Sequence, residues 1–175
     1  GQCISVARML ISDLDQPQGK AKRWDGTGFN APWDGIGNPI KSLQIPIENG
    51  GGPASSKSGG FHWGPSVSWN TYLNCWVMLM GHVEGQSWIG DKLYISFNYH
   101  KDLGINDHSQ KWTKPQVLVQ KPGHVLWYPS LQPMNTKEDI AAKNTSLKLG
   151  KKARLFFKYS NLGKYFSEYI IEFEK

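Results

Sequence analysis

One short pattern occurs twice in the chain, and it constrains the fold more than any other feature. The sequence WGPS at residues 63–66 returns as WYPS at residues 127–130. A polar break and then an apolar run follow each copy, at residues 75–80 in the first and 153–159 in the second. Self-similarity at a fixed spacing is typical of proteins built from repeated supersecondary units. The chain is therefore expected to hold two copies of one unit.

The first copy shows what that unit contains. Residues 65–69 form a short extended run, residues 70–74 have the Asn-rich chemistry of a tight turn, and residues 75–80 are continuously apolar. This order predicts a β-hairpin whose second strand is buried on both faces. Trp69 and Trp76 flank the turn, and we expect them to pack in the core rather than to bind a ligand.

Further strands are predicted after each hairpin. A third strand is expected at residues 92–98 in the first copy and 168–173 in the second, and a fourth at residues 112–119. Pro115 inside that fourth run fits an outer edge strand, where fewer backbone N–H groups are needed. Four antiparallel strands, repeated along the chain, are typical of the blade of a β-propeller. The predicted fold class is therefore all-β.

The whole chain is predicted to be a single partial propeller domain. Residues 1–48 hold a half blade and a loop, because residues 3–9 and 21–26 look like a third and an outer strand. Residues 60–120 hold one complete blade, and residues 124–175 hold three strands of another. A Gly- and Ser-rich loop precedes the complete blade, and a single helical turn is predicted within the last one.

Charge and cysteine content exclude some partners. The chain has 20 Lys and Arg against 14 Asp and Glu, a net charge of +6, yet its basic residues are scattered over turns and strand edges. Protection of strand edges explains them better than a nucleic-acid surface does. Cys3 and Cys75 lie in apolar runs and are expected to be buried free thiols, and no Cys/His spacing suits a metal. No apolar run has transmembrane length, so no membrane partner is expected, and no cofactor is predicted.

The residues of the two copies also carry a resemblance to a known family. The run WGPSVSWNTYLNCWVMLM, followed by LYISFN, WTKP and WYPSL, is similar to the C-terminal half of five-bladed β-propeller proteins related to glycoside hydrolase families 43 and 32. The opening CISVAR and RWDGTGFNAP resemble the preceding blade. The resemblance implies a partial five-bladed propeller of about two and a quarter four-stranded blades, whose axial pocket binds a sugar. It also implies a secreted or periplasmic protein, although no signal peptide is recognised in the chain.

Propeller geometry predicts which residues meet the sugar. The inner strands of neighbouring blades begin on one rim, and the loop between the second and third strands returns to it. The residues expected on that rim are His62, Trp63, Glu84, Trp88, Asp91, His124, Trp127 and Tyr128. Glu84 and Asp91 are the candidate catalytic acids, and the others are candidates for binding the sugar. The resemblance places the family's general acid at Trp63, and an indole cannot donate that proton.

Several kinds of function stay open from the sequence. The resemblance favours a glycoside hydrolase, the indole at Trp63 favours a sugar-binding propeller without catalysis, and the incomplete blade count favours a protein-interaction domain or a propeller remnant. For every rim residue, a purely structural role in packing or as a solvated charge competes with these. We expect weak or no hydrolysis. We also expect a homodimer through open blade faces, because residues 3–11 and 155–159 are apolar.

Overall fold

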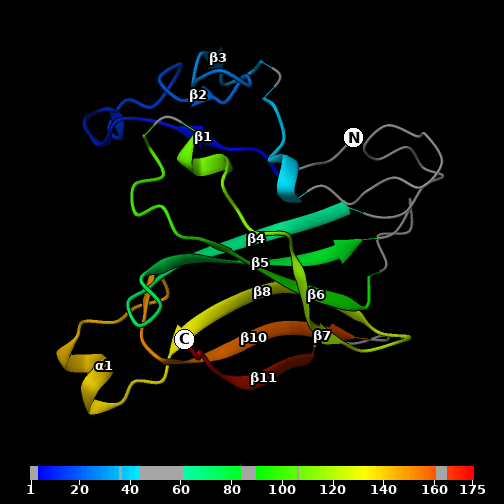
Figure 1. Cartoon of the computed structure of the whole chain (residues 1–175). Coiled ribbons are helices and arrows are strands. Elements are labelled where there is room, and N and C mark those ends of the chain that lie inside the picture. Colours follow the sequence, from blue (N-terminus) through cyan, green and yellow to red (C-terminus); the bar gives the residue numbers. More distant parts are fainter. Residues whose placement is uncertain (1–3, 36, 44–60, 84–89, 106, 161–164) are drawn as a thin grey trace.

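The computed structural model describes residues 4–35, 37–43, 61–83, 90–105, 107–160 and 165–175. Strand accounts for 46% and helix for 10%, and the sheets are curled, so the prediction of an all-β fold is confirmed. In chain order the elements are β1 (Ala7–Arg8), η1 (Ile11–Asp13), β2 (Lys22–Arg23), β3 (Ala31–Pro32), η2 (Lys41–Leu43), β4 (Phe61–Asn70), β5 (Cys75–Val83), β6 (Lys92–Asn98), η4 (His108–Gln110), β7 (Gln116–Gln120), β8 (Val125–Pro133), α1 (Lys137–Ala141), β9 (Lys148–Leu149), β10 (Lys152–Ser160) and β11 (Tyr165–Glu172). The largest sheet lies between an N-terminal and a C-terminal sheet (Figure 1).

The largest sheet contains the predicted hairpin. Its strand order is β7-β6-β5-β4-β9, and β4 to β7 form an antiparallel meander. Asn70 pairs with Cys75 across the turn, and Asn74 within the turn has a φ of 56°, a left-handed backbone that asparagine tolerates. Trp69 pairs directly with Trp76, with ring centroids 5.2 Å apart. These two indoles therefore pack on each other, as expected.

The outer strand of this sheet begins later than predicted. β7 starts at Gln116, directly after Pro115, whereas the strand was expected from Trp112 onward. Proline has no N–H to donate to a ladder. Trp112 belongs instead to a buried cluster, where its indole donates to the Ser109 carbonyl oxygen at 3.0 Å. The apolar character at Trp112 therefore reflects core packing and not strand pairing.

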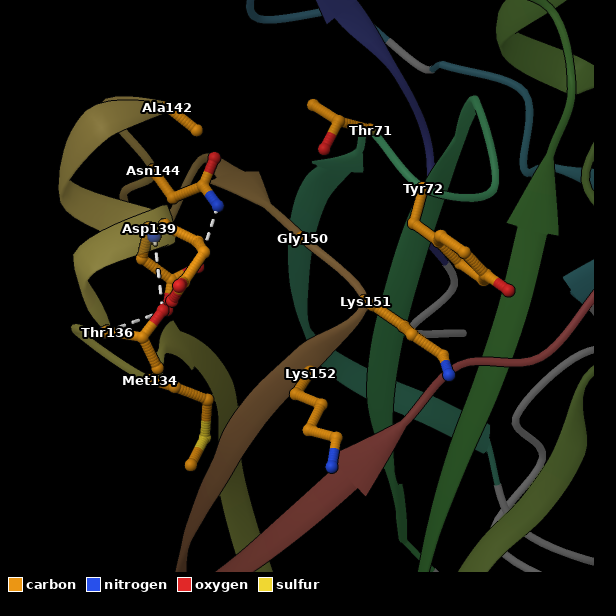
Figure 2. A pocket seen from close by; sticks show the side chains of 11 residues that line it. Thr71, Tyr72, Met134, Thr136, Asp139, Ala142, Asn144, Gly150, Lys151 and Lys152 are labelled. Carbon is orange, nitrogen blue, oxygen red and sulfur yellow. Dashed lines mark hydrogen bonds between the residues drawn. The ribbon is translucent and has the colours of Figure 1, made fainter.

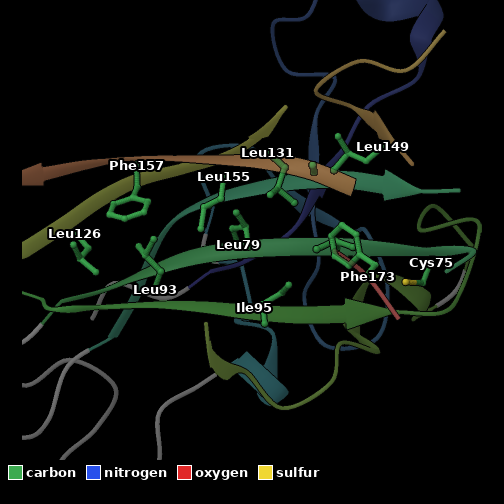
Figure 3. Close-up of a cluster of buried hydrophobic side chains, with 12 residues drawn as sticks. Cys75, Leu79, Leu93, Ile95, Leu126, Leu131, Leu149, Leu155, Phe157 and Phe173 are labelled. Carbon is green, nitrogen blue, oxygen red and sulfur yellow. The ribbon is translucent and has the colours of Figure 1, made fainter. Parts of the chain in front are cut away.

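β5 is buried on both faces, as predicted. Side chains alternate between faces along a strand, so Cys75 and Leu79 face the C-terminal sheet while Met78 and Met80 face the N-terminal segment. Figure 3 shows the first of these clusters between the stacked sheets. Burial raises the pKa of the free Cys75 thiol to about 11, so this cysteine is a core residue with little nucleophilic character. Cys3 lies outside the described residues.

The C-terminal sheet has the strand order β11-β10-β8 and is antiparallel throughout. Leu155 and Phe157 on β10 are fully buried against the largest sheet. The expectation that residues 155–159 present an open apolar face is therefore wrong for these two side chains, because alternation along β10 turns them into the core. Phe156 and Lys158 point to the outer face, where they are half-buried.

The N-terminal segment forms a small sheet of three short strands, β1, β2 and β3. β1 and β2 pair over two residues each, far less than the strands predicted at residues 3–9 and 21–26. The segment instead contributes side chains to the core. Ile40 and Leu43 are buried with Met80 in the cluster on the N-terminal face of the largest sheet. Burial of apolar surface, more than strand pairing, therefore holds this layer in place.

Candidate binding site

The two copies of the repeated pattern meet in space. Trp63 on β4 lies beside Trp127 and Tyr128 on β8, where the two strands begin side by side (Figure 1). The ring centroids are 6.2 Å apart for Trp63 and Trp127, 5.4 Å for Trp63 and Tyr128, and 5.9 Å for Trp127 and Tyr128. The planes of these pairs make angles of 62°, 53° and 71°. We call these three residues the aromatic cluster.

A bulge in each strand shapes this cluster. The β4–β5 ladder shifts register after Trp63, and the β8–β10 ladder shifts at the matching place, between Phe156 and Lys158 on β10. Gly64 and Tyr128 lie inside the two bulges, with left-handed φ angles of 58° and 53°. Because a bulge redirects the side chains beside it, the repeated pattern determines where the aromatic rings point.

Tyr128 is the unusual member of the cluster. A left-handed backbone costs a residue with a side chain about 1–2 kcal/mol, and such strain concentrates at binding and catalytic sites. Tyr128 is also 53% exposed, while Trp63 and Trp127 are half-buried beside it. An exposed ring held by two indoles presents a flat apolar face and a hydroxyl. That combination suits the apolar face and polar edge of a pyranose.

Two polar groups adjoin the aromatic cluster. The indole N–H of Trp127 is buried and has no hydrogen-bond partner among the described residues. Lys158 lies directly opposite Trp127 on β10, and its ammonium nitrogen is 5.2 Å from the centre of the Trp127 ring. This distance is within the range of a cation–π interaction. The cluster therefore combines aromatic faces with a positive charge.

His62 does not join the aromatic cluster, contrary to the prediction. Neighbouring residues of a strand point to opposite faces, so His62 turns away from the face that carries Trp63. Its Nδ1 lies 2.6 Å from the Leu43 carbonyl oxygen, and its ring centroid is 4.7 Å from that of Tyr94. Burial lowers the pKa of His62. His62 is thus a packing residue beneath the N-terminal layer.

His124 lies at the same end of the sheets but in another environment. Its ring stacks on Tyr159 at a centroid distance of 4.5 Å, and its Nε2 is 3.0 Å from the Tyr159 hydroxyl oxygen. The β8–β10 ladder places Tyr159 opposite Leu126, the residue before Trp127, and so on the face away from the aromatic cluster. His124 therefore connects the β7–β8 loop to β10 and lies on the other face from the aromatic cluster.

Only one of the two candidate acids, Asp91, lies among the described residues. Asp91 precedes β6, and its carboxylate lies 3.5 Å from the Gln120 amide nitrogen and 3.9 Å from the Lys92 ammonium. These partners belong to β7 and β6, away from the inner strand β4. Glu84 and Trp88 lie outside the described residues. Trp63, at the position where the resemblance predicts a general acid, packs in the aromatic cluster.

Sequence reasoning missed a pocket at the opposite end of the sheets. It has a volume of about 540 Å³ and lies between the β4–β5 turn, the α1 insertion and the start of β10 (Figure 2). Residues that line it include Thr71, Tyr72, Met134, Asp139, Asn144 and Gly150. These positions are far apart in the sequence and share no local pattern, so only the packing of the insertion against the hairpin turn creates the pocket.

The wall of this pocket is built by the predicted helical turn. Thr136 and Asp139 form a capping box at the start of α1, which confirms the turn. The Asp139 carboxylate also accepts a hydrogen bond from the Asn144 amide at 2.8 Å. Since the Asp139 oxygens are occupied by these contacts, its role is structural. Residues 144–146 read Asn-Thr-Ser, a pattern that matches a glycosylation acceptor, and the same bond engages the amide of this asparagine.

Comparison with known proteins identifies no relative: no protein-family model, no curated protein and no solved structure matches the chain. Within the described ranges, no three His, Cys, Asp or Glu side chains gather as a metal site would. Nor does any helix in these ranges combine the length and the apolar character needed to cross a bilayer.

Proposed function

We propose that the chain is a carbohydrate-binding domain in which the aromatic cluster stacks against a sugar. The observation that carries the proposal is Tyr128, an exposed tyrosine with a left-handed backbone at the position where the other copy of the repeat has Gly64. A glycine satisfies such a backbone without strain. A tyrosine that keeps the strain and leaves its ring in solvent is best explained by a use for that ring.

The proposed architecture is part of a five-bladed β-propeller related to glycoside hydrolases of families 43 and 32. β4 and β8 lie side by side, and each leads into an antiparallel meander, β4 to β7 in one sheet and β8, β10 and β11 in the other. Stacked sheets with adjacent inner strands are typical of neighbouring propeller blades. In that architecture the aromatic cluster lies on the rim where the inner strands begin, which is where propellers of this kind hold a sugar.

Binding without catalysis fits the residues better than hydrolysis. Glycoside hydrolysis needs two carboxyl groups on either side of the scissile bond, roughly 5 to 9.5 Å apart. Trp63 occupies the place expected for the acid, and Asp91 is engaged with Gln120 and Lys92 on the outer strands. The proposal is therefore a sugar-binding propeller with weak or no glycosidase activity.

Titration of the chain with oligosaccharides tests this proposal, using tryptophan fluorescence and calorimetry as readouts. Tyr128→Ala is expected to weaken binding about tenfold, because one stacking ring is removed. Tyr99→Ala is the matched control, since Tyr99 is 65% exposed but follows β6 at the other end of the sheet. Wild-type affinity in Tyr128→Ala, or no binding of any oligosaccharide, would contradict the proposal.

A further inference from the structure

The outer face of β10 carries three cations in a row. Lys152, Arg154 and Lys158 point away from the core, because the residues between them are the buried side of the strand. They differ in their partners. Lys152 lies 3.1 Å from Glu172, and Arg154 lies 3.9 Å from Glu168, both across the β10–β11 pair.

Lys158 has no carboxylate partner among the described residues. In the strand ladders, Lys158 pairs with Phe166 on β11 and with Trp127 on β8. Its ammonium nitrogen instead lies 5.2 Å from the centre of the Trp127 ring. Of the three cations on this face, Lys158 is therefore the one that no described carboxylate pairs with, and it stands directly beside the aromatic cluster.

The position of Lys158 is set by strand pairing and not by chance orientation of a surface chain. Directly opposite residues on neighbouring antiparallel strands have Cβ atoms about 4.5–5.5 Å apart. Strand pairing thus keeps the ammonium group of Lys158 close to the Trp127 ring. A net charge of +6 on the whole chain adds a long-range attraction for anions.

We propose that the saccharide bound by the aromatic cluster is acidic, with an anionic substituent on the sugar ring held by the Lys158 ammonium. This inference rests on the proposed sugar binding and names its ligand class. The aromatic rings contact the apolar face of the sugar, and Lys158 contacts a carboxylate or a sulfate at its edge. A lysine is a compact point charge and binds either group, so the chemistry required is an anion beside a pyranose face.

The test compares three trisaccharide-sized probes by calorimetry: an oligogalacturonate, its methyl ester, and a sulfated galactose oligosaccharide. The methyl ester keeps the sugar and removes the charge. We expect the oligogalacturonate, the sulfated probe or both to bind about fivefold more tightly than the ester, with the difference shrinking between about 50 mM and about 500 mM salt. The pair of acidic probes separates carboxylate from sulfate as the preferred anion.

Lys158→Gln is expected to abolish this difference, so that this variant binds the acidic probes and the methyl ester with equal affinity. Lys152→Gln is the matched control, because it removes the same charge from the same face of the same strand, where Glu172 already pairs with it. If the ester binds as tightly as both acidic probes, or if Lys158→Gln discriminates as the wild type does, the inference fails and sugar binding stands. If none of the three probes binds while another oligosaccharide binds in the titration described above, the inference fails and sugar binding stands. If no oligosaccharide binds, both the inference and the proposed function fail.

Discussion

Gly64 and Tyr128 occupy the same place in the two copies of the repeat and share a left-handed backbone, with φ angles of 58° and 53°. Each is preceded by a tryptophan and followed by a proline. A Cβ atom added at Gly64 would meet no other atom within 4 Å, so space does not require glycine there. What distinguishes the copies is that Tyr128 keeps a strained backbone and gains an exposed ring.

This comparison predicts an unusual order of stability at position 128. In an ordinary strand, a protein with glycine at a given position is about 0.5–1 kcal/mol less stable than the same protein with alanine there. At Tyr128 we expect the reverse: Tyr128→Gly should unfold with a free energy about 1 kcal/mol higher than Tyr128→Ala, because only glycine relieves the left-handed strain. Urea denaturation of the two variants measures this difference. Gly64→Ala serves as the companion variant, and its free energy of unfolding should be about 1 kcal/mol lower than that of the wild type. If Tyr128→Ala is as stable as Tyr128→Gly, no strain is stored at position 128.

Glycosidase activity is predicted to be absent or very weak. The chain should show no turnover approaching the ordinary enzyme range of about 1 to 1000 per second on aryl glycosides or oligosaccharides. The reason is chemical, since the resemblance puts the indole of Trp63 at the position of the general acid, and each catalytic group contributes about two to four orders of magnitude. Product analysis after long incubation provides the measurement. Stoichiometric release of sugar within seconds would contradict the prediction.

The stability of the fold should depend on pH through His62. Burial lowers the pKa of His62 in the folded chain, whereas in the unfolded chain it titrates near 6.5. Between these two values the unfolded state binds more protons, so the free energy of unfolding falls as the pH is lowered through 6.5, by up to about 1.4 kcal/mol per pH unit. In His62→Gln this dependence should be reduced. Equal pH profiles for the two proteins, measured by urea denaturation from about pH 7.5 to about pH 5, would rule out the effect.

Self-association is expected through the outer face of the C-terminal sheet. Ile170 is 65% exposed on that face, opposite Arg154 on β10, and half-buried Phe156 lies on the same surface. These apolar groups lie beside the ion pairs of β10 and β11, and exposed apolar side chains with complementary charges around them favour packing against a second copy. Sedimentation equilibrium over a hundredfold concentration range should show a reversible dimer that Ile170→Lys weakens. Val117→Lys on the outer strand β7 is the control, because Val117 is 49% exposed on a different surface. A monomer at all concentrations would contradict this prediction.

The sequence predicted the strands better than the directions of their side chains. The hairpin at residues 65–80 was predictable because an Asn-rich turn and a continuous apolar run leave few alternatives. The grouping of His62 with Trp63 was wrong because adjacent residues were treated as neighbours on one rim, whereas the pleat sends them to opposite faces. The contact between Trp63 and Trp127 follows from the repeat. The bulges that direct the rings are visible only in the structure, as register shifts in the two ladders and as positive φ angles at Gly64 and Tyr128.

The pairing of β9 bears on how a ligand approaches. β9 runs parallel to β4 and joins it at Trp69 and Asn70, with the Thr71 N–H donating to the Leu149 carbonyl oxygen at 2.9 Å. The insertion that carries α1 therefore covers the inner edge of β4 at the turn end, far from Trp63. A polysaccharide laid along that edge would run into the insertion. If the proposed sugar binding is correct, we therefore expect this edge to take the end of a sugar chain rather than its middle.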